Sequence, residues 1–219
     1  MRRRHFLTLS ASTVGGLLVY SLDRTPSRVH AQEGTLRVPL KFFTEEQALD
    51  VAAAAARIFP SDESGPGATE AGVVIYIDRQ LAGPYGKDRY RYTQPPFEKG
   101  LPEQGYQDAA NPRDIYREGL KPLAGFHRRE AAEQDKILTG IESTVFFTLL
   151  RTHTIEGMFC DPMHGGNRDM IGWQLIGFPG PRMSYLEEVD QYHGRAFRPK
   201  PVSLAEVVGH RVRPSEEEE

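Results

Sequence analysis

TEEQALDVAAAAARIFP, residues 44–60, contains the start, the apolar face and the end of a single helix. Thr44 and Gln47 stand in the spacing of a capping box, which is typical of a helix N terminus. Apolar side chains then recur at helical spacing up to the stop at Pro60, namely Leu49, Ala52, Ala53, Ala56, Ile58 and Phe59. This stretch predicts a helix and indicates a mainly α domain.

Residues 73–81 (VVIYIDRQL) allow two interpretations. Their β-branched residues suit a strand, whereas the apolar positions also fit one helical face, formed by Val73, Val74, Ile77 and Leu81. We interpret this segment as a second helix.

Two more helices are predicted downstream. Asn111 before Pro112 is typical of an N-cap and a first helical residue. The inward positions of this helix are Ile115, Tyr116, Leu120, Leu123 and Phe126. The next helix is predicted over residues 143–156, with Gly157 as its C-cap.

A long irregular segment, residues 83–111, separates these helices. It is polar and proline-containing, yet it carries the aromatic residues Tyr85, Tyr90, Tyr92, Phe97 and Tyr106. Long structureless segments are uncommon inside compact domains, and disordered segments are poorer in aromatics. We therefore expect an arm that contacts another protein, and a fold that is a small irregular helical domain with long loops wrapping a partner subunit.

Residues 157–180 (GMFCDPMHGGNRDMIGWQLIGFPG) are rich in glycine and hold the only cysteine, Cys160, and the only tryptophan, Trp173. The run Gly165-Gly166-Asn167 can adopt positive φ, which leaves two alternatives open. Its amides could form an anion-binding nest, or the run could serve as a tight turn with close backbone packing.

The same region raises a metal-binding alternative, because it gathers residues that are common metal ligands: His153, Glu156, Cys160, Asp161 and His164. His153 and Glu156 have the reverse of the di-iron helix spacing, which favours a packed His153. Asp161 precedes Pro162 and is better suited to a turn or cap than to acid–base catalysis. The unpaired thiol of Cys160 suits either a buried apolar site or an intermolecular disulfide.

The N terminus, Arg3-Arg4-His5-Phe6-Leu7 followed by a mildly apolar stretch to Leu22, is typical of a twin-arginine export signal. An ordinary Sec leader with a basic start is the alternative. Small residues at Val29 and Ala31 predict cleavage after Ala31. We therefore divide the chain into a signal peptide (1–31), one domain (32–213) and an acidic disordered tail (214–219).

Composition limits the classes of function. The first 31 residues hold five arginines and one aspartate, so their removal changes the net charge from −3 to −7, which argues against a nucleic-acid partner. No later apolar run approaches the roughly 20 residues of a membrane span. The chain also lacks GxGxxG, CxxCH, GxSxG and CxxC motifs, so independent flavin binding, haem attachment and hydrolysis are not indicated.

The pattern G-x-F-x-D-P-x-x-G-G-N-x-x-x-x-x-W-x-x-I-G-x-P-G over residues 157–180 resembles the gluconate 2-dehydrogenase subunit 3 family, the small subunit of membrane-associated flavin-dependent dehydrogenases. The resemblance extends to Phe43-Thr44, Phe59-Pro60, residues 77–81, Gly105-Tyr106 and residues 116–120. The chain departs from the family pattern at His164, where an aromatic residue is usual.

The resemblance implies a non-catalytic subunit that binds no cofactor or metal itself. It implies a periplasmic complex, reached through the Tat translocase, with an FAD-containing large subunit of the glucose-methanol-choline type and in some complexes a multihaem cytochrome c subunit. Association with the membrane would then be indirect, and the substrate would be a sugar, sugar acid or polyol. The interface residues implied are Tyr106, Cys160, Asp161, Pro162, His164, Gly165, Gly166, Asn167 and Trp173. The alternative function is an independent metal-binding or redox protein that uses His153, Cys160 and His164.

Overall fold

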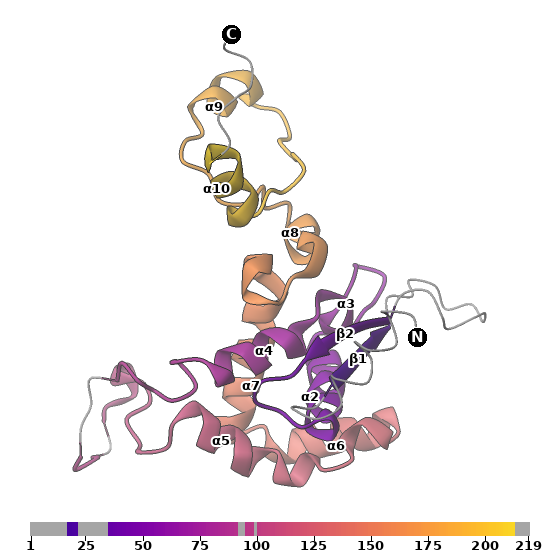
Figure 1. Ribbon diagram of the computed structural model, residues 1–219, viewed down its shortest axis with the longest axis vertical. Helices are drawn as coiled ribbons and strands as arrows, with labels where there is room; N and C mark the ends of the chain where they lie inside the picture. The colour runs from indigo at the N-terminus through magenta and orange to yellow at the C-terminus, as the bar shows by residue number, and fades with distance from the viewer. Residues whose placement is uncertain (1–16, 22–34, 92–94, 99, 213–219) are drawn as a thin grey trace, which may run out of the picture.

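The computed structural model describes residues 17–21, 35–91, 95–98 and 100–212, and its architecture is mainly helical (Figure 1). In chain order the strands and α-helices are β1 Leu17–Ser21, β2 Thr35–Pro39, α2 Glu45–Ile58, α3 Ala68–Ala71, α4 Val73–Ala82, α5 Pro112–Gly119, α6 Ala131–Ile141, α7 Val145–Phe159, α8 Ile171–Ile176, α9 Leu186–Tyr192 and α10 Leu204–Val212. Short 3₁₀ turns lie at Pro102–Gln104, Lys121–Leu123, Phe126–Arg128, Pro162–His164 and Arg168–Met170.

The first two predicted helices are confirmed, but the buried face of α2 carries Ala48, Val51, Ala54 and Ala55, whereas the predicted Leu49, Ala52, Ala53 and Ala56 are only half-buried. In α2 the Thr44 hydroxyl accepts a hydrogen bond from the Gln47 amide, and the Gln47 side chain accepts one from the Thr44 amide, as a capping box requires. Residues 73–81 are helical in α4, whose Val73, Ile77 and Leu81 are completely buried. The helix, which we predicted from the spacing of the apolar residues, is therefore correct, and the strand alternative is wrong.

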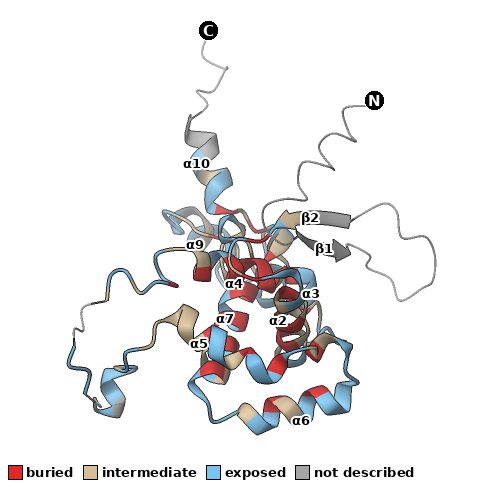
Figure 2. Cartoon of the chain, turned by 60° about the horizontal axis from the view of Figure 1, so that its bottom comes forward, coloured by how far each residue is buried: buried red, intermediate tan, exposed pale blue. Residues whose placement is uncertain are grey.

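The core lies where α2, α4 and α7 meet, and Figure 2 shows the buried residues concentrated on these helices. Gly157, which was predicted to cap α7, instead lies inside that helix, so this expectation is wrong. A Cβ at Gly157 would lie 3.1 Å from Cγ1 of Val73, which shows that the glycine lets α4 and α7 approach closely. The C-cap of α7 is Cys160.

The predicted helix over residues 112–126 is shorter than expected. Asn111 caps it as predicted, but α5 ends at Gly119 and two 3₁₀ turns follow. Pro122 explains the difference, because its ring clashes with the preceding helical turn and it has no N–H to donate. Leu123 and Phe126 still reach the core and are completely buried.

Two segments project from this body in Figure 1. The described residues between 83 and 111 (83–91, 95–98 and 100–111) extend away from the ends of α4 and α5, and α8 leads upward to a small lobe formed by α9 and α10. Among the described residues, no helix combines the length and the apolar character that crossing a bilayer requires.

The strands β1 and β2 pair antiparallel beside α2. β1 belongs to the predicted signal peptide, whereas Arg3, Arg4, Phe6, Leu7 and Ala31 lie outside the described residues, as does the acidic tail.

Candidate partner interface

Two buried carboxylates fix loops onto the helical core. Asp78 of α4 accepts hydrogen bonds from three consecutive amides, those of Lys41 (2.8 Å), Phe42 (2.9 Å) and Phe43 (2.9 Å). It thereby holds the chain that joins β2 to α2. Because several N–H donors stabilise an ionised carboxylate, a buried aspartate is tolerated at this position.

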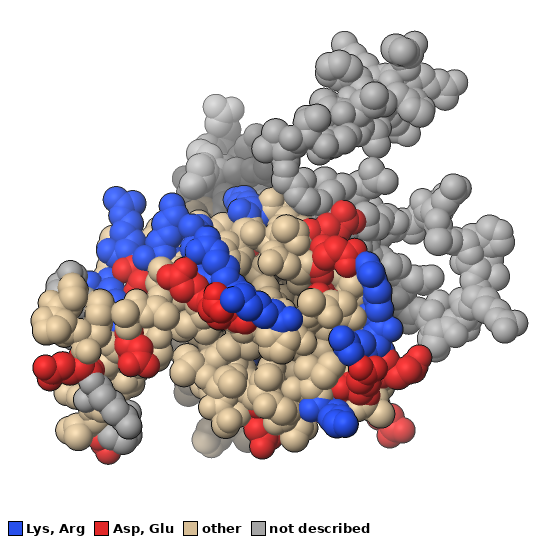
Figure 3. Space-filling view, turned by 90° about the horizontal axis from the view of Figure 1, so that it is seen from below, with Lys and Arg blue, Asp and Glu red and all other residues tan. Residues whose placement is uncertain are grey.

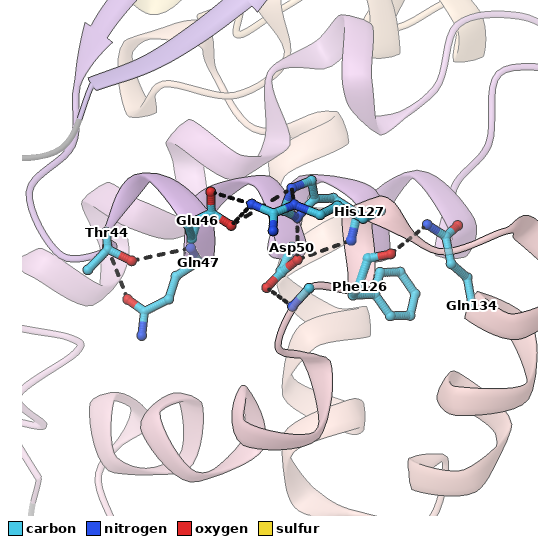
Figure 4. A network of polar contacts seen from close by, with 9 residues as sticks. Thr44, Glu46, Gln47, Asp50, Phe126, His127 and Gln134 are labelled. Atoms are coloured by element: carbon cyan, nitrogen blue, oxygen red, sulfur yellow. Dashed lines mark hydrogen bonds and ion pairs between the residues drawn. The ribbon is translucent and has the colours of Figure 1, made fainter.

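Asp50 of α2 has the same role on another side of the core (Figure 4). Its carboxylate accepts from the amides of Gly125 and His127, both at 3.0 Å, and from Nδ1 of His127 at 2.6 Å. The buried Gln134 of α6 donates to the carbonyl of Phe126. This network secures the second of the two 3₁₀ turns that follow α5, Phe126–Arg128.

His153 connects the arm to the core. Its Nδ1 lies 2.9 Å from the hydroxyl of Tyr116, and its Nε2 lies 2.8 Å from the hydroxyl of Tyr85. Burial lowers the pKa of His153 to about 4, so the ring is neutral near pH 7. A neutral imidazole has one donor and one acceptor nitrogen, and both are used here. The alternative of a packed, hydrogen-bonded His153 therefore matches the structure.

Tyr85 also borders a hollow between the arm and the helices. This hollow has a volume of about 410 Å³ and is lined by Tyr85, Asp88, Arg91, Tyr106, Ala110, Pro112, Ile115, Val145, Thr148, Leu149 and Thr152. Burial is the main cause that raises the pKa of Tyr85, to about 12, so the hydroxyl remains protonated. A second hollow of about 430 Å³ shares Ala110 and Ile115 with the first and continues past Phe146.

The exposed side of α7 next to these hollows is uncharged at four positions spaced along one face, Val145, Thr148, Thr152 and Ile155. Val145 is 48% exposed, although the neighbouring Phe146 and Leu150 are buried. We call the two hollows and this stripe the α5–α7 surface. Exposed apolar side chains grouped beside hollows make this surface a candidate interaction site.

The described aromatic residues of the arm are exposed, and two of them, Tyr85 and Tyr106, line the first hollow. Tyr90 is 81% and Tyr106 41% exposed, and Phe97 is also accessible. Arg91 lies over the rings of Phe97 and Tyr106 and donates to the carbonyl of Asp108. Tyr92, the fifth aromatic residue of the predicted arm, lies outside the described residues. These rings supply contact area of the type enriched in protein interfaces.

The run Gly165-Gly166-Asn167 forms a tight turn with close packing, which was one of the two alternatives. The Asn167 amide donates to the carbonyl of Gly157 at 2.7 Å, and its side chain joins Cys160 O to the amide of Gly172. A Cβ at Gly166 would lie 2.3 Å from the Gly157 carbonyl oxygen. Because the Gly165 amide donates to Pro162 O, the amides of Gly165 and Asn167 serve this chain rather than an anion-binding nest.

The predicted interface residues of this segment are partly internal. Trp173 is buried and donates from Nε1 to the carbonyl of Phe159, and Asn167 is completely buried. Asp161 caps a 3₁₀ turn through Met163 N and also accepts from Leu204 N, which matches its expected role as a turn-former. His164 is exposed, Gly166 is buried, and Pro162 and Gly165 are half-buried. Contact of this set with a partner stays a prediction.

Cys160 is half-buried against the core, and its thiol lies 3.8 Å from the carbonyl oxygen of Gly157. Burial raises its pKa to about 11. Within the described part of the chain, no three His, Cys, Asp or Glu residues are grouped as a metal site would require.

Sequence reasoning missed three structural roles, those of Asp50, Asp78 and the pair Tyr116–His153. A signal was present for the aspartates, since each stands among apolar residues in a helical segment, where a charged residue needs partners. The tyrosine–histidine pair had no such signal, because its members are far apart in the sequence.

The profile of the family described as Gluconate 2-dehydrogenase subunit 3 matches residues 45–180. The chain belongs to this family. No curated protein and no solved structure matches it.

The matched region of this gluconate 2-dehydrogenase subunit 3 protein contains the core, the arm and the α5–α7 surface, whereas α9 and α10 follow it. The resemblance drawn from residues 157–180 is confirmed. As a subunit, the chain is expected to act within an oxidoreductase complex of several proteins.

Proposed function

We propose that this chain is the non-catalytic accessory subunit of a periplasmic, FAD-dependent dehydrogenase complex of the gluconate 2-dehydrogenase type. In this role it carries the export signal, accompanies the folded flavoprotein large subunit through the Tat translocase and stabilises it afterwards. FAD would be held by the large subunit, and haem c by a cytochrome subunit where one is present.

The observation that carries the proposal is the exposed α5–α7 surface beside the aromatic arm. The exposed stripe of this surface on α7 is uncharged, and the two charged residues that line the first hollow, Asp88 and Arg91, form an ion pair with each other. His153 is bonded to two tyrosines, and Tyr76 donates to Glu156 at 2.9 Å. Such an arrangement suits association with a protein better than chemistry on a small molecule.

The surface charge is compatible with a protein partner. On the face shown in Figure 3, Lys and Arg side chains alternate with Asp and Glu, and wide uncharged areas lie between them. A protein surface is the class of partner that such a mixture of apolar area and both charges accommodates.

Purification of the tagged chain from the periplasm of its source cell tests the proposal. We expect a second, larger protein to copurify, with a flavin absorption spectrum and dehydrogenase activity toward a sugar, sugar acid or polyol. The mature chain purified alone should be colourless and inactive. A chain that purifies alone from the periplasm, or that carries flavin or metal without a partner, would contradict the proposal.

A further inference from the structure

The only strand pair among the described residues joins two segments that lie on opposite sides of the predicted cleavage site. β1 precedes Ala31 and β2 follows it, and they pair from Leu17 opposite Pro39 to Ser21 opposite Thr35. β1 also contacts α2. Removal of the signal peptide would therefore take β1 away and leave one edge of β2 without its strand partner.

The pairing register identifies which backbone groups would lose their partners. Hydrogen-bonded and non-hydrogen-bonded pairs alternate along an antiparallel ladder. Because Pro39 has no N–H, its pair with Leu17 must be a non-hydrogen-bonded one. The hydrogen-bonded pairs are then Leu18 with Val38 and Tyr20 with Leu36. Leu36 and Val38 direct their N–H and C=O groups toward β1, whereas those of Arg37 point to the other side.

The segment that follows β2 is held firmly against the helical body. Val38 packs partly against the core and Leu40 is buried. The next three amides, of residues 41–43, are bonded to the buried carboxylate of Asp78. The chain leaving β2 is therefore held to α4 after cleavage, and a strand edge left unpaired in this way is a template for another extended segment.

We propose that β2 is a docking edge that β1 covers in the precursor and that an extended, uncharged segment of the large subunit covers in the mature complex. The inference rests on the proposed function, because that function supplies both the cleavage and the partner. The exchange is a form of β-strand addition, in which main-chain hydrogen bonds provide the affinity.

The chemistry of the incoming segment follows from the strand that it replaces. β1 has the sequence LLVYS, and its Val19 lies opposite Arg37. A second copy of this chain fits less well, because symmetric antiparallel pairing of two β2 strands about their centre would place Arg37 opposite Arg37. Like charges directly opposite each other destabilise a strand pair.

Amide hydrogen exchange of the peptide spanning residues 35–40 tests the inference in three samples: the precursor, the mature chain alone and the purified mature complex. We expect slow exchange in the precursor, at least tenfold faster exchange in the mature chain, and slow exchange again in the complex. Equal, fast exchange in the mature chain and the complex would overturn the inference. Slow exchange in a mature chain that is dimeric would also overturn it, because a second copy would then be the occupant.

A matched pair of proline variants tests the ladder itself. Leu36→Pro removes an N–H that faces the pairing strand, whereas Arg37→Pro removes one that faces away. We expect Leu36→Pro to weaken the affinity for the large subunit at least tenfold, and Arg37→Pro to change it less than threefold. Equal effects of the two variants would contradict pairing at this edge. A complex that forms without protection of residues 35–40 refutes only this inference, whereas failure to form any complex refutes the proposed function.

Discussion

The hydroxyl of Tyr116 lies 2.9 Å from Nδ1 of His153, and the two rings are stacked with 15° between their planes. Both side chains are buried, so a charge on His153 would be poorly solvated. Burial therefore lowers the pKa of His153 from 6.5 to about 4.

This pKa predicts a stability that rises with pH. Between about pH 4 and 6.5 the unfolded His153 binds a proton that the folded one does not, so unfolding is favoured as the pH falls through this range. From pH 7 to pH 5 the loss should be about 2 kcal/mol in the free energy of unfolding. Urea unfolding of the wild type and of His153→Phe at both pH values measures it. If His153→Phe retains the same pH dependence, another group causes it.

Replacement of two helical glycines by alanine should have opposite effects on the stability of the chain. A Cβ at Gly172 would lie 1.9 Å from the carbonyl oxygen of Met158, whereas a Cβ at Gly140 would meet nothing within 4 Å. We expect Gly172→Ala to destabilise the chain by roughly 3 kcal/mol. Gly140→Ala should stabilise it by up to about 1 kcal/mol, because alanine is the better helix former. Thermal melting of both variants checks this contrast, and equal melting temperatures would show that the approach of Gly172 to α7 is unimportant.

Asp78 should be more important for stability than any exposed acid. Asp78→Asn replaces one of the oxygens that accept backbone amides with an NH₂ group, which should cost roughly 2–3 kcal/mol. Asp135→Asn, at an exposed ion pair with Arg57, is the control and should leave the unfolding midpoint nearly unchanged. Comparable destabilisation by both variants would contradict the role assigned to the three amides.

The sequence predicted the local parts of this structure better than its long-range contacts. The capping box at Thr44 and the Asn111-Pro112 start were readable because they involve neighbouring residues. Gly157 was predicted as a C-cap because the sequence alone does not distinguish a capping glycine from a glycine inside a helix. Its contact with Val73 of α4, which explains the glycine, is a long-range one. The helix α6 was not predicted, since few of its residues are apolar enough to show a clear face.

The same limit applies to the candidate interface. The aromatic arm could be predicted from its unusual composition, and the described aromatic residues of the arm are exposed. The α5–α7 surface could not, because it combines α5, the arm and α7, which are separate in the sequence. Its exposed apolar residues have the same appearance in the sequence as the buried Phe146 and Leu150 beside them.

The α5–α7 surface makes a prediction about binding. Val145→Arg places a charge on its exposed stripe, and we expect the affinity for the large subunit to fall at least a hundredfold, about 3 kcal/mol. Because Val145 is 48% exposed, the fold should tolerate the change. Ala132→Arg, on the exposed side of α6, is the control. Titration calorimetry or copurification measures both, and unchanged binding of Val145→Arg would place the interface elsewhere.

The central claim, that this chain carries the export signal for a folded flavoprotein, is tested most directly by the variant with Arg3→Lys and Arg4→Lys. Lysine keeps the positive charge but not the arginine pair that the Tat translocase recognises. Dehydrogenase activity and flavoprotein are measured in the periplasmic and cytoplasmic fractions. We expect both this chain and the flavoprotein to remain in the cytoplasm, with wild-type cells as the reference. Normal periplasmic dehydrogenase activity in the variant would contradict the account.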